Sequence, residues 1–500
     1  MNIRPLLVNQ HLNSVLCGTL ENRHSRKLLL KLVKRQLSRE SETYRPDDMP
    51  VQAKIDRLDC LSGLLDGFDR IFLRGIVSKS VMKQVVHSFL GNVVLNEDVR
   101  EIERRHGGVS PPAFIVISPT GKCNLRCKGC YAADAALQGR QLSFEVFDRI
   151  LREKREMWGS HWTVISGGEP FMWKDGEWDL VKLARRHPMD IFMVYTNGTL
   201  IDDEFAARLA EAGNISPAIS VEGFETETDA RRGEGVYQRI LKAFDALRRH
   251  GVPFGVSATA TRHNWATITS DEFIDFYYMD QGALYGWIFQ YMPMGRGQTL
   301  DLIVPPEERV EMSRRMWHLV RERKILMVDF WNSGTVTQGC ISAAREGGYF
   351  HINWDGDIMP CVFTPYAGGN INTLYAEGGN LDDVIDLPFF RRIREWQEEY
   401  GYGKPAKDTG NWLCPCAIRD HFDVFSEVAK ASGAVPINPE AGQAITDSGY
   451  HQGMIDYGRR MAELTDMDWA GKYTRVYKKQ AANDAEGGSS DDTALTRSNY

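Results

Sequence analysis

The feature that most constrains the fold is a repeated alternation of apolar runs and helical periods from residue 113 to about residue 297. Strands that alternate with amphipathic helices form a parallel sheet with helices outside it, which is an α/β fold. The predicted strands are Ala113–Ser118, Trp162–Ser166, Ile191–Thr196, Pro217–Val221, Pro253–Thr261 and Trp287–Met292. The predicted helices between them are Phe144–Trp158, Trp178–Arg186, Asp203–Ala212, Val236–His250 and Asp271–Met279.

Three cysteines with the spacing C-x3-C-x2-C follow the first predicted strand: Cys123, Cys127 and Cys130. Three thiolates on one short loop can each bind an iron at a corner of a single cubane cluster, which needs four ligands. The fourth iron would then be open to a substrate or cosubstrate. A zinc knuckle and three unrelated buried thiols are the alternatives. Zinc sites usually have a fourth cysteine or a histidine nearby, and His106 lies on the far side of the strand.

The other predicted strands also end in polar or glycine-rich sequence. Function in parallel α/β folds collects at the carboxyl ends of the strands. In Ser166-Gly-Gly-Glu-Pro170, the glycines allow close approach of a ligand and Glu169 offers a carboxylate to an ammonium group. Each such segment is also typical of a turn, but five at one edge of a sheet favour a binding site. The candidates at these ends are Gly167, Gly168, Glu169, Asn197, Ser220, Arg232 and Thr259.

The cysteine motif, the aromatic Tyr131 after it and the Gly-Gly-Glu-Pro segment together resemble the radical S-adenosylmethionine (SAM) superfamily over about residues 110 to 300. The resemblance implies a partial (β/α)6 barrel and a [4Fe-4S] cluster on Cys123, Cys127 and Cys130. SAM would bind the open iron through its amino and carboxylate groups. It also implies that Gly167, Gly168 and Glu169 hold the SAM amino group, and that Tyr131 faces adenine.

Two further residues match the family more loosely. Ser220 and Arg232 stand where relatives place ribose and carboxylate contacts. Many relatives have Ser-x-Asp-Gly at the fourth strand, whereas this chain has Glu222, to which no role is assigned. The implied reaction is reductive cleavage of SAM to a 5′-deoxyadenosyl radical that removes hydrogen from an organic substrate. The cofactor carries that reactivity, and the protein supplies orientation and a closed cavity.

A second cysteine set follows a predicted helix near Pro306–Arg323: Cys340, Cys361, Cys414 and Cys416. A predicted hairpin over His351–Pro360, with Asp355-Gly356 as its turn, would bring Cys340 and Cys361 together. The set resembles the opening of the SPASM/Twitch extensions of the same superfamily, although a full SPASM domain has about seven cysteines. The expectation is one auxiliary [4Fe-4S] cluster with all its irons ligated, and the alternative is a structural zinc site.

The chain before the sheet is predicted to be helical. In Ser25–Ser38 the side chains of Leu29, Leu30, Val33 and Leu37 share one helical face, opposite a basic face. The helix either packs on the body of the protein or contacts an anionic membrane or a partner. The segment Phe68–Val94 is predicted to form one or two core helices, and Cys17 and Cys60 are expected to be isolated buried thiols.

Composition excludes several classes of function. A net charge of −7 with 25% charged residues gives no footprint for nucleic acid, and no apolar run is long enough to span a membrane. The nine cysteines fall mostly into ligand-like sets, which predicts that the protein resides in a reducing cytoplasm.

The chain is expected to divide into five parts. They are a helical region at 1–110, a radical SAM barrel at 111–300, an auxiliary cluster domain at 301–425, C-terminal helices at 426–478 and a disordered tail at 479–500.

The function predicted is therefore radical SAM catalysis on an organic substrate, with a peptide as the leading class. A lipid or a small metabolite is the alternative substrate, and a flavodoxin or ferredoxin is the expected electron donor. A rival prediction is a non-catalytic iron–sulfur or zinc protein. Glu169 argues against that rival, because an electron carrier needs no ammonium-binding carboxylate beside an open cluster.

Overall fold

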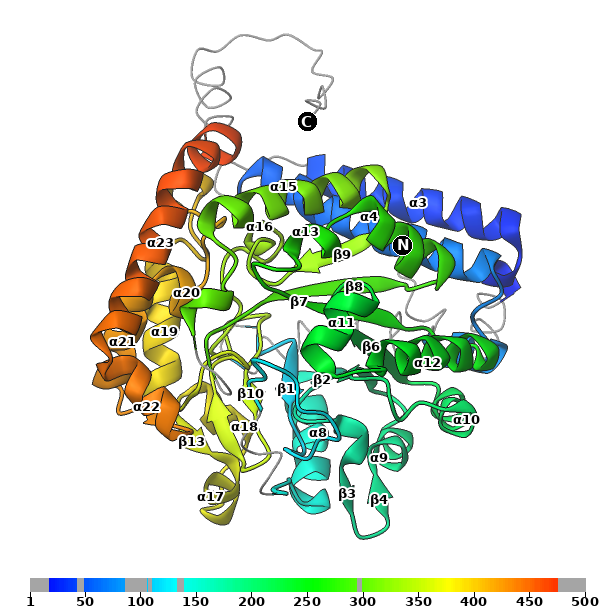
Figure 1. The fold of residues 1–500 in the computed structure, drawn as a ribbon, viewed down its shortest axis with the longest axis horizontal. Coiled ribbons are helices and arrows are strands. Elements are labelled where there is room, and N and C mark those ends of the chain that lie inside the picture. Colours follow the sequence, from blue (N-terminus) through cyan, green and yellow to red (C-terminus); the bar gives the residue numbers. More distant parts are fainter. Residues whose placement is uncertain are drawn as a thin grey trace.

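A ten-stranded open sheet organises the fold in this computed structural model, which describes residues 18–42, 49–85, 106, 110–132, 139–294 and 299–474 (Figure 1). The strand order is β13-β11-β10-β1-β2-β5-β6-β7-β8-β9. The strands from β10 to β9 pair in parallel, while β11 and β13 add an antiparallel edge. The two edges of this sheet do not pair with each other in the order, so the barrel is partial, as predicted.

All six predicted strands are confirmed, with small differences at their ends. They are β1 (Phe114–Ile117), β2 (Trp162–Ile165), β5 (Ile191–Thr196), β6 (Ile215–Val221), β7 (Gly255–Ala260) and β8 (Tyr285–Gln290). The sequence did not predict the strand β9 (Leu326–Asp329), nor that β10 (His351–Ile352), the first strand of the predicted hairpin, would join the parallel sheet beside β1. Strands this short carry too few residues for a period of two to stand out.

Side chains alternate between two apolar layers along these strands. Ile115 and Ile117 belong to the core shared with the helices, whereas Val116 belongs to a second cluster with Val164 and Met193 inside the curve of the sheet. This is the period of two that places neighbouring side chains on opposite faces of a strand. Val116, Val164 and Met193 also line the cavity described below.

The helices between the strands begin and end at sequence signals for capping. Ser143 caps α8 (Phe144–Trp158), and Asp202 caps α10 (Asp203–Ala212), each by accepting a hydrogen bond from the first turn. Gly251 ends α12 (Val236–His250) in the left-handed region at φ 68°, where glycine has no Cβ to strain. The other helices of this part are α9 (Leu180–Arg186), α11 (Glu225–Arg232), α13 (Trp265–Ile268) and α14 (Asp271–Ile274), which continues as a π-helical segment (Asp275–Asp280).

The N-terminal region is helical, as predicted, with α3 (Arg23–Glu42), α4 (Val51–Leu73) and α5 (Lys79–Val85). The predicted apolar face of α3 is half-buried, and two of its basic residues bind α4: Arg26 pairs with Asp69 at 2.7 Å and Lys34 with Asp66 at 2.6 Å. This helix therefore packs on the body of the protein. Cys60 is buried, as predicted. Cys17, Phe89, Leu90, the predicted strand end at 295–297 and the predicted disordered tail lie outside the described residues.

Helices also dominate the part of the chain that follows β8. They are α15 (Pro306–Glu322), α16 (Gly334–Thr337), α17 (Ile371–Ala376), α18 (Leu381–Ile385), α19 (Pro388–Glu399), α20 (Ala417–Asp420), α21 (Phe422–Ala431), α22 (Pro439–Thr446) and α23 (Ser448–Asp468). The predicted hairpin is confirmed, because β10 pairs antiparallel with β11 (Asp357–Met359), which in turn pairs with β13 (Gly369–Asn370). Short pairs complete the strands: β3 (Lys174–Asp175) with β4 (Trp178–Asp179), and β12 (Tyr366–Ala367) with β14 (Val435–Pro436).

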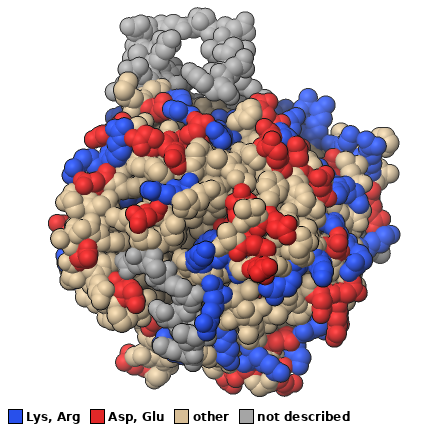
Figure 2. All heavy atoms as spheres, in the orientation of Figure 1, with Lys and Arg blue, Asp and Glu red and all other residues tan. Residues whose placement is uncertain are grey.

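Charges of both signs are interspersed over the face shown in Figure 2. Within the described part of the chain, none of the helices has the length and apolar character needed to cross a membrane.

Candidate functional site

The three-cysteine loop runs from the end of β1 and is tied to the neighbouring strand ends. Cys123, Cys127 and Cys130 are each partly exposed. Between them, Gly129 has φ 65°, and an added Cβ would lie 2.8 Å from the ring of Tyr291. The amide of Lys128 donates to the carbonyl of Arg231 at 2.9 Å. Both contacts come from residues more than 90 positions away in the sequence, so the tertiary fold holds the loop in place.

The Gly-Gly-Glu segment packs directly on the cysteine loop. The Gly168 amide donates to Thr120 O at 2.9 Å, and the Glu169 amide donates to Lys122 O at 2.7 Å. A Cβ on Gly168 would lie 2.2 Å from Lys122 O, and one on Gly167 would lie 2.7 Å from Thr120 O. The sequence predicted that these glycines allow close approach of a ligand. In the structure they allow close approach of the cysteine loop.

Glu169 is fully buried and joins this segment to the end of β5. Its carboxylate accepts hydrogen bonds from Thr196 Oγ1 at 2.7 Å, the Asn197 amide at 2.8 Å and the Phe171 amide at 3.2 Å. Burial raises the pKa of Glu169 to about 7, although these three hydrogen bonds favour the charged carboxylate and act to lower it. No cationic side chain of the described residues forms an ion pair with it. A ligand ammonium group within reach would supply the missing positive charge.

Tyr131 and Asn197 add contacts around the three-cysteine loop and the Gly-Gly-Glu segment. Tyr131 Oη lies 2.7 Å from Ser166 Oγ and accepts from the Gly167 amide at 3.0 Å. The side-chain amide of Asn197 donates to Asn124 Oδ1 at 2.8 Å and lies 3.9 Å from Cys123 Sγ. These predicted residues therefore join the cysteine loop to the ends of β2 and β5.

A buried carboxylate that sequence reasoning left without a role organises the next strand ends. Glu222, only 1% exposed, accepts from Arg231 Nη1 at 2.5 Å and from Arg232 Nη2 at 2.5 Å. It also accepts from the amide of Thr259 at 3.2 Å, and Arg231 donates to Thr259 Oγ1 at 3.1 Å. Glu222 was considered without a role and Arg231 was missed, although two adjacent arginines nine and ten residues after a strand-end carboxylate were a usable signal.

One cavity of about 900 Å³ joins most of the predicted site residues. Cys60 and residues of α4, including Leu64 and Phe68, line its other end. Glu169 is buried behind the cavity wall rather than lining it. The predicted site residues that line the cavity are Cys123, Cys127, Cys130, Tyr131, Gly167, Gly168, Asn197, Ser220, Arg232, Thr259, Cys340, Cys361 and Cys416.

The second cysteine set is also brought together in part. Tyr349 Oη lies 2.8 Å from Cys361 Sγ. Burial and the nearby Cys340 raise the pKa of Cys361, and burial, Asp420, Cys340 and Cys361 raise the pKa of Cys416. Cys414 lies elsewhere, buried with its thiol 3.1 Å from Thr465 Oγ1. His421 precedes α21, and its ring bonds the Cys414 carbonyl at 2.9 Å.

The donor chemistry of both sets suits a cluster. Burial raises the pKa of Cys123 and of Cys361 to about 12, so both need a metal to become thiolates near neutral pH. Among the described residues, no three His, Cys, Asp or Glu side chains are arranged to hold one metal ion. A cubane binds each thiolate at a separate corner and does not require that convergence.

Comparison with known proteins agrees with this site. Residues 117–269 match the family model "Radical SAM superfamily". The chain is 28% identical over 310 residues to "Mycofactocin maturase MftC" of Mycobacterium ulcerans, covering 60% of this chain and 81% of that protein. It is 25% identical over 316 residues to "AdoMet-dependent heme synthase" of Methanosarcina barkeri, covering 58% and 87%. Among solved structures, "Native anSMEcpe with bound AdoMet" has 16% identity and a TM-score of 0.45, covering 67% of this chain and 99% of that one.

The sheet is open and parallel, and loops rich in thiols and glycines follow the carboxyl ends of its strands. This arrangement is that of an α/β enzyme that depends on a cofactor. Residues 117–269 form a radical SAM domain, and the chain is similar over more than half its length to proteins of this kind.

Proposed function

We propose that Cys123, Cys127 and Cys130 hold the SAM-binding [4Fe-4S] cluster and that the later cysteines hold a second cluster in a SPASM/Twitch-like region. The observation that carries this is the direct packing of the Gly-Gly-Glu segment on the three-cysteine loop, with both thiol sets on one cavity. We keep the domain boundaries after residues 110, 300, 425 and 478 as part of the proposal. Cytoplasmic residence and a flavodoxin or ferredoxin as electron donor also belong to it.

Each part of the chain has a distinct role in this proposal. With SAM on its open iron, a reduced cluster would supply reductive cleavage to a 5′-deoxyadenosyl radical, which abstracts hydrogen from the substrate. The Gly167-Gly168-Glu169 segment would hold the SAM ammonium group, with Glu169 supplying negative charge from behind the cavity wall, while Ser220 and Arg232 would contact the ribose and carboxylate of SAM. Glu222 would hold Arg232 in position. The apolar wall of the cavity would exclude water.

The substrate class is proposed to be a peptide, because "Mycofactocin maturase MftC" is among the relatives. A small metabolite is the second candidate, since "AdoMet-dependent heme synthase" is similar to the chain at nearly the same identity. Both candidates fit a cavity with an aromatic wall. That wall contains Phe114, Trp162, Tyr195, Tyr285, Trp287, Phe289, Phe330, Trp331, Tyr349 and Phe363.

Anaerobic reconstitution tests the proposed chemistry. We expect about eight irons per chain for two cubanes, and 5′-deoxyadenosine after addition of SAM and dithionite. About four irons with one zinc would reassign the later cysteines to a structural site and leave SAM cleavage intact. Clusters without any 5′-deoxyadenosine, even with cell lysate as the substrate source, would favour the non-catalytic prediction.

The substitution Glu169→Gln should weaken SAM binding by about tenfold to a hundredfold, because a hydrogen bond to a charged group is worth about 1.5–3 kcal/mol. Isothermal titration of SAM into the reconstituted protein measures the change. Glu177→Gln is the matched control, since Glu177 lies exposed between β3 and β4. Equal affinities in the two variants would contradict the assigned role.

A further inference from the structure

The four later cysteines do not share one environment. Cys340, Cys361 and Cys416 line the cavity, whereas Cys414 is 1% exposed and lies against α23. On α23, Thr465 Oγ1 donates its hydrogen to Met461 O at 2.7 Å. Cys414 Sγ lies 3.1 Å from Thr465 Oγ1, which also accepts from Asn411 Nδ2 at 2.9 Å. Cys414 is therefore packed against α23 and does not line the cavity with the other three cysteines.

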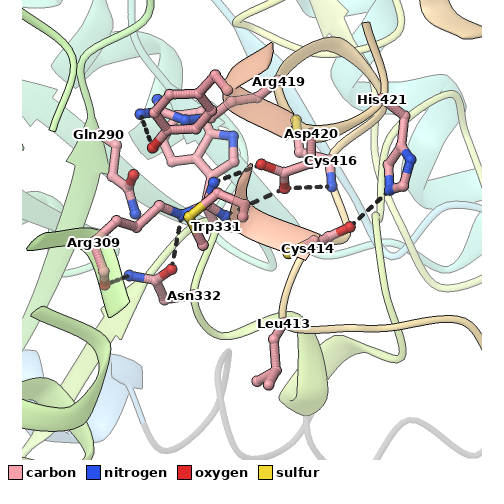
Figure 3. Close-up of polar contacts among 12 residues, drawn as sticks. Gln290, Arg309, Trp331, Asn332, Leu413, Cys414, Cys416, Arg419, Asp420 and His421 are labelled. Atoms are coloured by element: carbon pink, nitrogen blue, oxygen red, sulfur yellow. Dashed lines mark hydrogen bonds and ion pairs between the residues drawn. The ribbon is translucent and has the colours of Figure 1, made fainter. Parts of the chain in front are cut away.

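The Cys-Pro-Cys loop is held in this orientation by bonds on both sides (Figure 3). The Cys414 carbonyl accepts from His421 Nε2 at 2.9 Å and from Tyr400 Oη at 3.3 Å. The Cys416 amide donates to Asp420 Oδ2 at 3.1 Å, and Asp420 is bound in turn by Arg309 at 2.5 Å. These contacts hold Cys416 at the cavity while Cys414 faces α23.

A buried arginine beside the three cavity cysteines is consistent with an anionic group there. Arg345 is 5% exposed and lines the cavity, and its guanidinium carbon lies 3.9 Å from the ring centroid of Tyr402. It donates to the backbone carbonyls of Gln338 at 2.8 Å and Thr337 at 2.7 Å. Within the part of the chain that the structure describes, no carboxylate forms an ion pair with it. An anionic thiolate-bound cluster would balance this buried charge.

We propose that the second cluster is held by Cys340, Cys361 and Cys416 alone, so that one of its irons is open to the shared cavity. A lone-pair donor of the substrate, such as a carboxylate, amine or thiolate, would bind that iron. The chain would then present two open clusters to one cavity, one for SAM and one for the substrate. This inference rests on the proposed second cluster, and it replaces the expectation that Cys414 is its fourth ligand.

A matched pair of substitutions within the loop tests the ligand set. Cys414→Ala should keep about eight irons per chain after anaerobic reconstitution, whereas Cys416→Ala should keep about four. Loss of about four irons in both variants would overturn the proposal. A wild-type chain with about four irons and one zinc would also overturn it. That result would leave the proposed SAM cleavage standing.

A second measurement needs no change at Cys414, so it holds even if that variant fails to fold. The triple variant Cys123→Ala, Cys127→Ala, Cys130→Ala leaves only the second cluster. Cyanide labelled with ¹³C is added to the reduced protein, and electron–nuclear double resonance is recorded. A ¹³C hyperfine coupling is expected from cyanide bound at an open iron. Its absence from a formed cluster would mean that every iron is already ligated and would overturn the proposal.

Discussion

Replacing Cys127 with alanine should lower the iron content from about eight to about four per chain and abolish 5′-deoxyadenosine formation. The reason is that three thiols of one loop are the only protein ligands proposed for the SAM-binding cluster, and two cannot retain it. Iron is counted after anaerobic reconstitution, and 5′-deoxyadenosine is measured by liquid chromatography after SAM and dithionite are added. We expect product below the detection limit, which is the largest change in activity predicted for this chain.

The same chemical change at another buried thiol provides the control. Cys60 lies on α4, apart from both cysteine sets, at the other end of the cavity. Cys60→Ala should keep about eight irons per chain and should keep SAM cleavage. If Cys127→Ala cleaved SAM as the Cys60 variant does, the loop would not be the site of the chemistry.

The largest loss of stability is expected for Arg309→Met. Arg309 and Asp420 are both buried, and the guanidinium binds the carboxylate at 2.5 and 3.2 Å (Figure 3). Burial alone would raise the pKa of Asp420, but Arg309 helps to hold this pKa below its usual range. Removing one partner leaves the other charge buried and unpaired, which costs about 3–5 kcal/mol. The urea midpoint, followed by tryptophan fluorescence under anaerobic conditions, should fall accordingly.

Two further variants separate the ion pair from the loss of a side chain. The double variant Arg309→Met, Asp420→Leu removes both charges and should be more stable than Arg309→Met alone. Arg314→Met on the same helix removes a mostly exposed arginine, 3.9 Å from Asp468, and should change stability by less than about 1 kcal/mol. Similar midpoints for Arg309→Met and Arg314→Met would show that the buried pair contributes little.

Local patterns explain why much of the fold was predictable. Each of the six strands and most helices between them is defined by apolar spacing within a few residues and by caps such as Ser143 and Asp202. The three-cysteine loop and the Gly-Gly-Glu segment were likewise recognisable, because their spacing is a property of one short stretch. The short strand β9 was missed, as was the parallel pairing of the hairpin strand β10 with β1.

The sequence by itself determined the class of fold, the presence of a radical SAM domain and the position of both cysteine sets, because these depend on neighbouring residues. Only the tertiary structure decided that Glu222 binds both arginines, that the glycines pack on the cysteine loop, and that the three-cysteine loop shares one cavity with Cys340, Cys361 and Cys416. It also separated Cys414 from Cys416, two positions apart in the sequence. These outcomes depend on hydrogen bonds and packing between residues far apart along the chain, which local spacing does not encode.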